Sequence, residues 1–205
     1  PLSPPKPGDP PKPPSPWKPL FFDNDFRYLD KPGNTVHNTF DFLKRNRLLD
    51  GDLVFDFGGE FRWQAKGEDS RRLQGEQNNY NLFRERLYVD TWYKNRLRTY
   101  WEVYWADASE QTVEPIFADN DHGDVNNAFA EFRALRVEDD DGWWSIRYGW
   151  HEELLFGNQR LVSPLDWANA RRTFDLIPHL LYKAKTWNYD LFWSRPNIVL
   201  ARELN

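Results

Sequence analysis

The stretch NLFRERLYVDTWYKNRLRTYWEVYWA, residues 81–106, decides the fold of this chain. Apolar and polar side chains alternate along residues 81–93 and again along residues 97–106, and this period of two is that of a half-buried β-strand. Three polar residues, Lys94, Asn95 and Arg96, separate the two runs. So short a connection joins antiparallel neighbours, and the stretch therefore predicts a β-hairpin with one apolar and one charged face.

The same alternation recurs in further segments of the chain: residues 53–63, 127–137, 143–152, 173–184 and 187–194. Pro178 interrupts the fourth of these segments and predicts a bulge or an edge position there. We therefore expect seven antiparallel strands. Their polar faces carry seven acids and seven bases, namely Asp56, Glu60, Asp90, Glu102, Glu131, Asp175 and Asp190 with Arg62, Arg84, Arg86, Arg98, Arg133, Arg147 and Lys183.

The connections between the expected strands alternate in length. Long ones span residues 65–79, 108–126 and 155–171, whereas short ones lie at residues 94–96, before Gly142 and near Thr186. A soluble β-meander has no reason to alternate so regularly. An up-and-down transmembrane β-barrel of the outer membrane does, because one rim carries tight periplasmic turns and the other carries long outer loops.

The amino-acid composition agrees with a barrel of this kind. Aromatic residues make up 17% of the chain and include 11 Trp, although only 40% of residues are hydrophobic. Such Trp content suits a sugar-binding surface, a protein interface or the aromatic girdles of a membrane barrel. No apolar run reaches the roughly 18 residues of a membrane helix. The net charge of −5 argues against a nucleic-acid partner, and the absence of Cys excludes disulfides and thiolate metal sites.

The segment before the strands differs in composition. Residues 1–19 hold ten of the 15 prolines and predict an extended tether, either a passive spacer or a ligand for a periplasmic partner. Residues 35–47 predict a short amphipathic helix, capped by Asn34 or Thr35. We divide the chain into the tether (1–19), a short helical periplasmic segment (20–50) and the barrel strands (51–205), with the N-terminus on the periplasmic, short-turn side.

The run RLVSPLDWANARRTFD (160–175), preceded by IRYGWHEELLFGNQ (146–159), resembles the alginate-export porins of bacterial outer membranes. Segments NYNLFRERLYVDTWY and GGEFRW also resemble the start of that barrel, so the likeness covers roughly residues 50–200. Trp150 departs from the pattern, which has a polar or basic residue there. The matching residues are Arg147, Gly149, Glu152, Gly157, Arg160, Leu161, Asp166, Trp167, Asn169, Arg171, Arg172, Phe174 and Asp175.

The resemblance implies a pore in outer-membrane lipid for an anionic polysaccharide or other small anionic solutes, with arginines at its constriction. Guanidinium groups suit this task because they stay charged and can bind a carboxylate through two parallel hydrogen bonds. Seven strands do not close such a pore, so we expect the chain to be the N-terminal part of a larger barrel; the alternative is an assembly in which several chains close one pore. The candidate pore-lining residues are Arg84, Arg86, Arg98, Arg133, Arg147, Arg160, Arg171, Arg172, Asp166 and Asp175.

The balanced charges allow a plainer interpretation of the same arginines. Acids and bases on neighbouring strands can pair with one another and stiffen the barrel wall without meeting a solute. Anion selectivity is thus an implication of the resemblance, because it does not follow from the charge count. Whether each arginine pairs within the wall or contacts solute stays open from the sequence.

Other chemistry finds little support in the sequence. Asp119, Asp121 and Asp124 form a weak candidate for Ca²⁺ in an outer loop, although the spacing is not that of an EF-hand. The four His have no metal-ligand spacing, and no nucleophile, phosphate-loop or metalloprotease motif is present. Glu152 and Glu153 are adjacent, so on a strand they point to opposite faces and do not flank one bond. We expect no enzyme and no cofactor.

One alternative to the barrel remains. A soluble β-sandwich that binds carbohydrate on Trp platforms would also alternate apolar and polar residues, since its apolar face packs inward and its charged face is solvated. The sandwich predicts a protein that is stable without detergent and does not require long and short connections to alternate.

Overall fold

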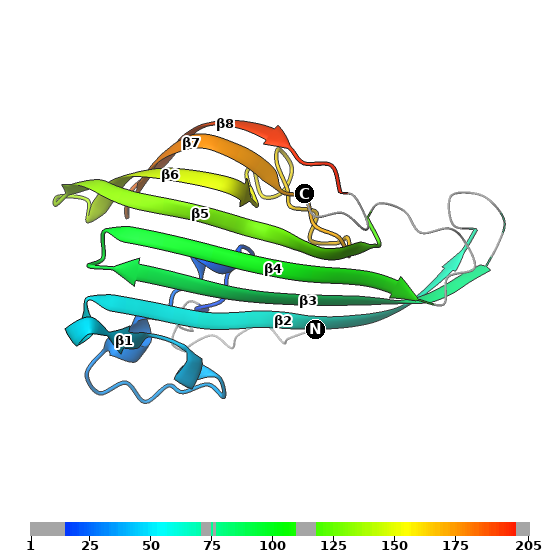
Figure 1. Cartoon of the computed structure of the whole chain (residues 1–205), viewed down its shortest axis with the longest axis horizontal. Helices are drawn as coiled ribbons and strands as arrows, with labels where there is room; N and C mark the ends of the chain where they lie inside the picture. Colours follow the sequence, from blue (N-terminus) through cyan, green and yellow to red (C-terminus); the bar gives the residue numbers. More distant parts are fainter. Residues whose placement is uncertain (1–14, 71–74, 76, 110–117, 200–205) are drawn as a thin grey trace, which may run out of the picture.

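The computed structural model describes residues 15–70, 75, 77–109 and 118–199 of the chain. These residues form one antiparallel sheet in which the strands follow one another in sequence order, as Figure 1 shows. The strands are β1 (Asn46–Leu48), β2 (Leu53–Asp69), β3 (Gln77–Tyr93), β4 (Leu97–Ser109), β5 (Asp121–Val137), β6 (Gly142–Glu152), β7 (Phe174–Lys183) and β8 (Asn188–Pro196).

The seven long strands, β2 to β8, are the seven that the alternating pattern predicts. The β3–β4 hairpin pairs Tyr93 with Leu97 across the three-residue connection. Within it Lys94 and Asn95 adopt φ values of 48° and 53°. Two consecutive left-handed residues match the right-handed twist of the flanking strands, which fixes the register of this hairpin. The prediction of an all-β up-and-down sheet is confirmed.

The two faces of the sheet differ in the way the sequence predicts. Trp63, Trp101 and Trp193 on the convex face are 58%, 53% and 79% exposed. On the concave face Arg84 and Arg86 are each only 1% exposed. Large apolar side chains therefore face outward, while charged side chains are enclosed.

The pairing of the strands is irregular at Pro178, where the sequence predicts it, and also between β4 and β5. The register of β7 against β8 shifts between Leu176 and His179, on either side of Pro178, which confirms the predicted bulge. Proline has no N–H to donate to the ladder, so the strand must deviate there. The register of β4 against β5 also shifts, next to Val103 and again before Ala106, although β4 contains no proline or glycine.

Two groups of predicted boundaries need correction. The strands run further toward the long-loop rim than their core patterns suggest, because β2 ends only at Asp69 and β3 begins at Gln77. Likewise β5 begins at Asp121, so part of the expected outer loop 108–126 is strand. The third long connection, between β6 and β7, is present as predicted. Polar outer ends of strands lack the apolar alternation by which strands are recognised.

The helix predicted over residues 35–47 is reduced to a single 3-10 turn, Asp41–Leu43, followed by strand β1. Side chains compete with the helical backbone here. Asn34 accepts a hydrogen bond from the Val36 backbone N–H, and Asp41 accepts one from the Asn38 backbone N–H. Such local bonds favour turns over helix. Further 3-10 turns lie at Phe21–Asp23, Arg27–Asp30 and Leu49–Gly51.

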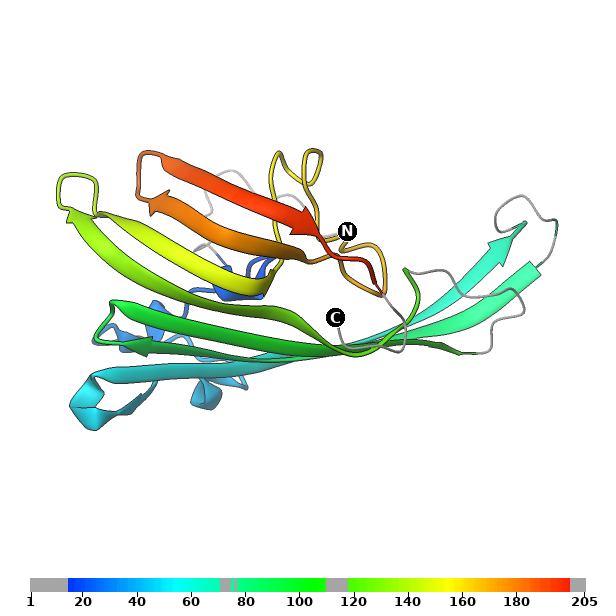
Figure 2. The same ribbon diagram turned by 45° about the horizontal axis from the view of Figure 1, so that its top comes forward.

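Two segments cover the concave face of the sheet. Residues 15–30, the N-terminal insert, lie within the curve of the sheet near the short turns, where Figure 2 shows them in blue. Residues 153–173, the loop insert, connect β6 to β7 and pack over the half of the concave face toward the long loops. Residues 1–14 of the predicted tether lie outside the described residues. None of the helices in the described part of the chain is long and apolar enough to span a bilayer.

Candidate functional site

The concave face is lined by arginines that neighbouring strands bring together. Arg84 and Arg86 lie on β3, Arg98 on β4 and Arg147 on β6, all at inward positions of the two-residue repeat. Each is almost completely buried. A buried guanidinium group must be compensated by acceptors, so its partners determine what it can do.

Each of these four arginines pairs with an acid on the same face. Arg84 contacts Glu60 at 2.6 Å and Arg98 contacts Asp90 at 2.8 Å. The other pairs are Arg86 with Glu102 at 2.6 Å and Arg147 with Glu131 at 2.7 Å. The plainer interpretation, in which opposed charges stiffen the wall, therefore describes the contacts of these four.

The loop insert is fastened to this face by a second set of ion pairs. Arg171 is fully buried and pairs with Glu153 and with Asp166, while Arg86 contacts Glu153 from the other side at 3.2 Å. Burial alone would raise the pKa of the Glu153 carboxyl, but Arg171 and Arg86 outweigh this effect and bring it down to about 2. Glu153 therefore stays ionised and acts as the anchor of the loop insert.

Polar contacts to the backbone complete the docking of this loop. The Asn169 side-chain amide donates to the carbonyl oxygens of Phe83 and Asp119, each at 2.9 Å. Arg62 on β2 donates to the Ala168 carbonyl oxygen at 2.7 Å. The conspicuous run around Asp166 and Arg171 is thus a connection folded onto the concave face, as the sequence suggests.

The remaining predicted residues lie in different surroundings. Arg133 lies over the Trp92 ring at 4.1 Å and donates to the Asn95 side chain at 2.6 Å, near the short-turn rim. Asp175 on β7 pairs with Arg195 at 2.8 Å. Arg160 is exposed and Arg172 is half-buried. Within the described parts of the chain neither of these two guanidinium groups has a hydrogen-bond or ion-pair partner.

The three acids of the predicted Ca²⁺ site are all buried; Asp121 and Asp124 lie at the start of β5 and Asp119 just before it. Asp121 accepts a hydrogen bond from the Tyr104 hydroxyl. Gly123, at φ 84°, bends the chain between Asp121 and Asp124. Among the described residues no three His, Asp or Glu side chains are grouped so that they could hold a metal ion. The Ca²⁺ site stays a prediction.

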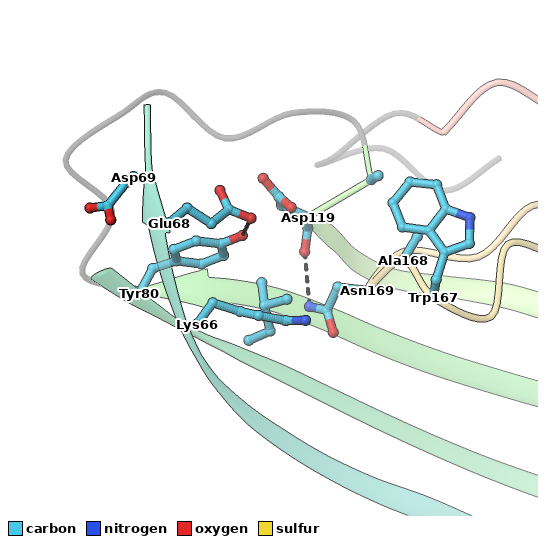
Figure 3. Close-up of a pocket in the computed structure, with 10 residues that line it drawn as sticks. Lys66, Glu68, Asp69, Tyr80, Asp119, Trp167, Ala168 and Asn169 are labelled. Atoms are coloured by element: carbon cyan, nitrogen blue, oxygen red, sulfur yellow. Dashed lines mark hydrogen bonds between the residues drawn. The ribbon is translucent and has the colours of Figure 1, made fainter. Parts of the chain in front are cut away.

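A cavity of about 390 Å³ lies where the outer ends of β2 and β3 meet the loop insert. Figure 3 shows Lys66, Tyr80 and Trp167 around it, with Tyr80 donating to Glu68 at 2.9 Å. Glu68, Asp69 and Asp119 also line it, so acids outnumber the one lysine. This excess of acids makes the cavity a poor site for an anion.

Two features of the site are missed by sequence reasoning. Glu152 and Glu153 do not point to opposite faces, because β6 ends at Glu152 and both side chains turn inward. Glu152 pairs with Arg147, and Glu153 with Arg86 and Arg171. The second omission is the N-terminal insert, in which Phe22 is buried against Tyr100 and Phe129. Two adjacent Phe in a proline-rich neighbourhood give no periodic signal.

Comparison with known proteins yields one match. A family model described as alginate export covers residues 54–205 of the chain. No curated protein and no solved structure matches. The matched range begins at the second residue of β2 and includes the whole loop insert, whereas the N-terminal insert lies before it.

Proposed function

The chain belongs to the alginate export family, and on this premise we propose that its sheet forms part of the wall of a channel that an anionic polysaccharide crosses passively. The family is one of transport proteins of the bacterial outer membrane. The antiparallel meander of β1 to β8 is the arrangement from which outer-membrane barrels are built.

The distribution of side chains between the two faces carries this proposal. In a soluble sheet the apolar face packs inward, whereas here Trp and Leu side chains are exposed on the convex face and arginines are enclosed on the concave face. A barrel wall requires this arrangement, because lipid contacts the outside and water fills the inside. The proposal places the concave face along the aqueous path and the N-terminus in the periplasm.

The arginines of the concave face divide into two classes by their partners. The paired ones, such as Arg84, Arg98 and Arg147, hold the wall and the loop insert in place. Arg160 and Arg172 extend from the loop insert without a partner in the described residues, so they are the groups that offer a free positive charge to a passing carboxylate. We assign the selectivity for anions to these two.

Planar-bilayer recordings test this assignment. The double variant Arg160→Ala, Arg172→Ala should lower the ratio of anion to cation permeability by roughly two- to fivefold, because exposed charges interact by about 0.4–1 kcal/mol. Arg136→Ala is the matched control, since Arg136 lies at the β5–β6 turn and pairs with Asp141 at 3.5 Å. Reversal potentials of the double variant equal to those of the control would contradict the assignment.

The membrane location has its own test. The native protein should fractionate with outer membranes, require detergent for extraction and migrate differently on gels before and after heating. A monodisperse protein in detergent-free buffer would contradict the channel, whatever the reversal potentials of the variants show.

A further inference from the structure

The N-terminal insert covers a row of aromatic side chains on the concave face. We propose that residues 20–26 are an internal, displaceable plug, which covers an aromatic track on the concave face where acidic sugar units of the transported polysaccharide bind. This inference rests on the proposed channel function and adds a binding site and a competitor for it. The plug precedes the range shared with the family.

The track consists of three aromatic side chains on three consecutive strands. Tyr88 on β3, Tyr100 on β4 and Phe129 on β5 are at most 5% exposed. The rings of Tyr88 and Tyr100 are stacked with centroids 5.6 Å apart, and those of Tyr100 and Phe129 with centroids 5.3 Å apart. The three rings therefore form a continuous row across the sheet.

Cationic groups flank this row. The Arg98 guanidinium lies 5.7 Å from the Tyr100 ring centroid, and Arg147 lies 4.1 Å from that of Phe129. The ring faces pack on one another and on Lys44 and Arg147, so a sugar ring would meet the ring edges in the space that Phe21 and Phe22 fill. Arg98 and Arg147 also pair with acids of the wall, Asp90 and Glu131. Release of the insert therefore frees the Arg98 N–H that donates to the Phe22 carbonyl oxygen and the Lys183 ammonium group that pairs with Asp23, and both can bind a sugar carboxylate.

The plug presents the same chemistry as a polymer of acidic sugar units. Phe22 packs edge-on against Tyr100 and Phe129, with ring centroids 5.7 Å and 5.3 Å away, and Phe21 lies against Tyr88 at 5.7 Å. Its neighbour Asp23 offers a carboxylate, which pairs with Lys183 at 2.9 Å. Apolar rings followed by a carboxylate thus occupy the track from within the chain.

The plug is attached to the sheet through contacts of side chains. Its backbone hydrogen bonds, such as Asp23 N–H to Leu20 O and Asp25 N–H to Pro16 O, stay inside the insert. In the described residues it forms no ladder with a strand, and Arg98 reaches it through the Phe22 carbonyl oxygen. Release of the plug therefore breaks side-chain contacts and the hydrogen bond from Arg98 to the Phe22 carbonyl oxygen, and it leaves the strand ladder intact, so the plug can open without unfolding the sheet.

A single reporter thiol tests the plug directly, because the chain has no Cys. Leu20→Cys places it in the cluster of Leu20 with Phe22 and Tyr100, where it should react slowly with a water-soluble maleimide. Adding Phe21→Ala and Phe22→Ala should speed labelling on the order of a hundredfold, since truncating buried Phe is strongly unfavourable. Adding Phe40→Ala and Phe42→Ala, an exposed pair outside the insert, should leave the rate unchanged.

Labelling of the full-length protein in detergent then tests whether an oligosaccharide binds the track and displaces the plug. Short alginate oligosaccharides should accelerate labelling of the Leu20→Cys protein, and neutral maltooligosaccharides at the same concentration should not. In bilayers the Phe21→Ala, Phe22→Ala variant should conduct more than the wild type and be blocked at lower oligosaccharide concentration.

Two results would overturn the proposal. One is equally fast labelling with and without Phe21 and Phe22. The other is an oligosaccharide that neither speeds labelling nor binds the Phe21→Ala, Phe22→Ala variant more tightly than wild type. A protected thiol that oligosaccharide releases, in a protein that never conducts, would refute the channel and support the plug and its track.

Discussion

Replacing Arg171 with Ala should release the loop insert from the concave face. Arg171 is fully buried and binds both Glu153 and Asp166. Leaving a buried charge without any partner costs about 3–5 kcal/mol. Glu153 keeps Arg86 at 3.2 Å, so we expect the smaller cost of lost charged hydrogen bonds, about 2–3 kcal/mol. That cost corresponds to roughly 30- to 160-fold more frequent opening of the loop.

Hydrogen exchange of residues 153–173 in detergent measures this opening. Arg172→Ala is the matched control, because it removes the same charge from the adjacent position without breaking an ion pair in the described residues. Its effect should stay within about 0.5 kcal/mol, close to a twofold change in exchange. If Arg171→Ala and Arg172→Ala exchange at the same rate, the ion pairs of Arg171 do not hold the loop and the reasoning fails.

Two further outcomes follow from the structure. Burial lowers the pKa of Lys44 to about 8, so the unfolded chain binds more protons than the folded one above that pH. The free energy of unfolding should therefore rise as pH increases from about 8 toward the ordinary lysine value of 10.5, and Lys44→Met should lose this rise. Leu87→Arg on the convex face should cost about 2–4 kcal/mol in lipid vesicles, whereas Gln77→Arg at the strand end should cost about 0–1 kcal/mol. Equal costs would contradict lipid contact.

The strands could be predicted because their signal is local. Each alternating segment contains its own period, and the contrast between Trp101 and its neighbours Tyr100 and Glu102 is readable without knowing what the strand pairs with. The bulge of β5 opposite Glu102 and Val103 could not be predicted, since it arises from how the two neighbouring strands fit, whereas the second bulge lies at Gly123, whose φ of 84° bends β5. The helix over residues 35–47 was wrong because side-chain bonds of Asn34 and Asp41 take up the backbone groups that a helix needs.

The sequence predicts which residues belong to the candidate site, but it does not predict which of them contact one another. The sequence predicts Arg84, Arg86 and Arg171 as pore-lining residues, and the structure shows that all three are buried on the concave side of the sheet. The sequence does not show that Glu153, far along the chain, joins Arg86 to Arg171, because that contact depends on the loop folding back over the sheet. The N-terminal insert is likewise a product of tertiary packing, since Phe22 finds its partners on β4 and β5.

Arg86 contacts both segments that cover the concave face, the N-terminal insert and the loop insert, which are the two covers of this face. Its guanidinium group lies 3.9 Å from the Phe21 ring of the N-terminal insert and 3.2 Å from Glu153 at the root of the loop insert. Removal of either neighbour admits water to the guanidinium group and weakens its hold on the other. The two covers are therefore expected to be cooperative, and by thermodynamic reciprocity displacement of either one lowers the cost of displacing the other by the same amount. In the proposed channel, a polymer that dislodged the first cover would thereby loosen the second ahead of itself.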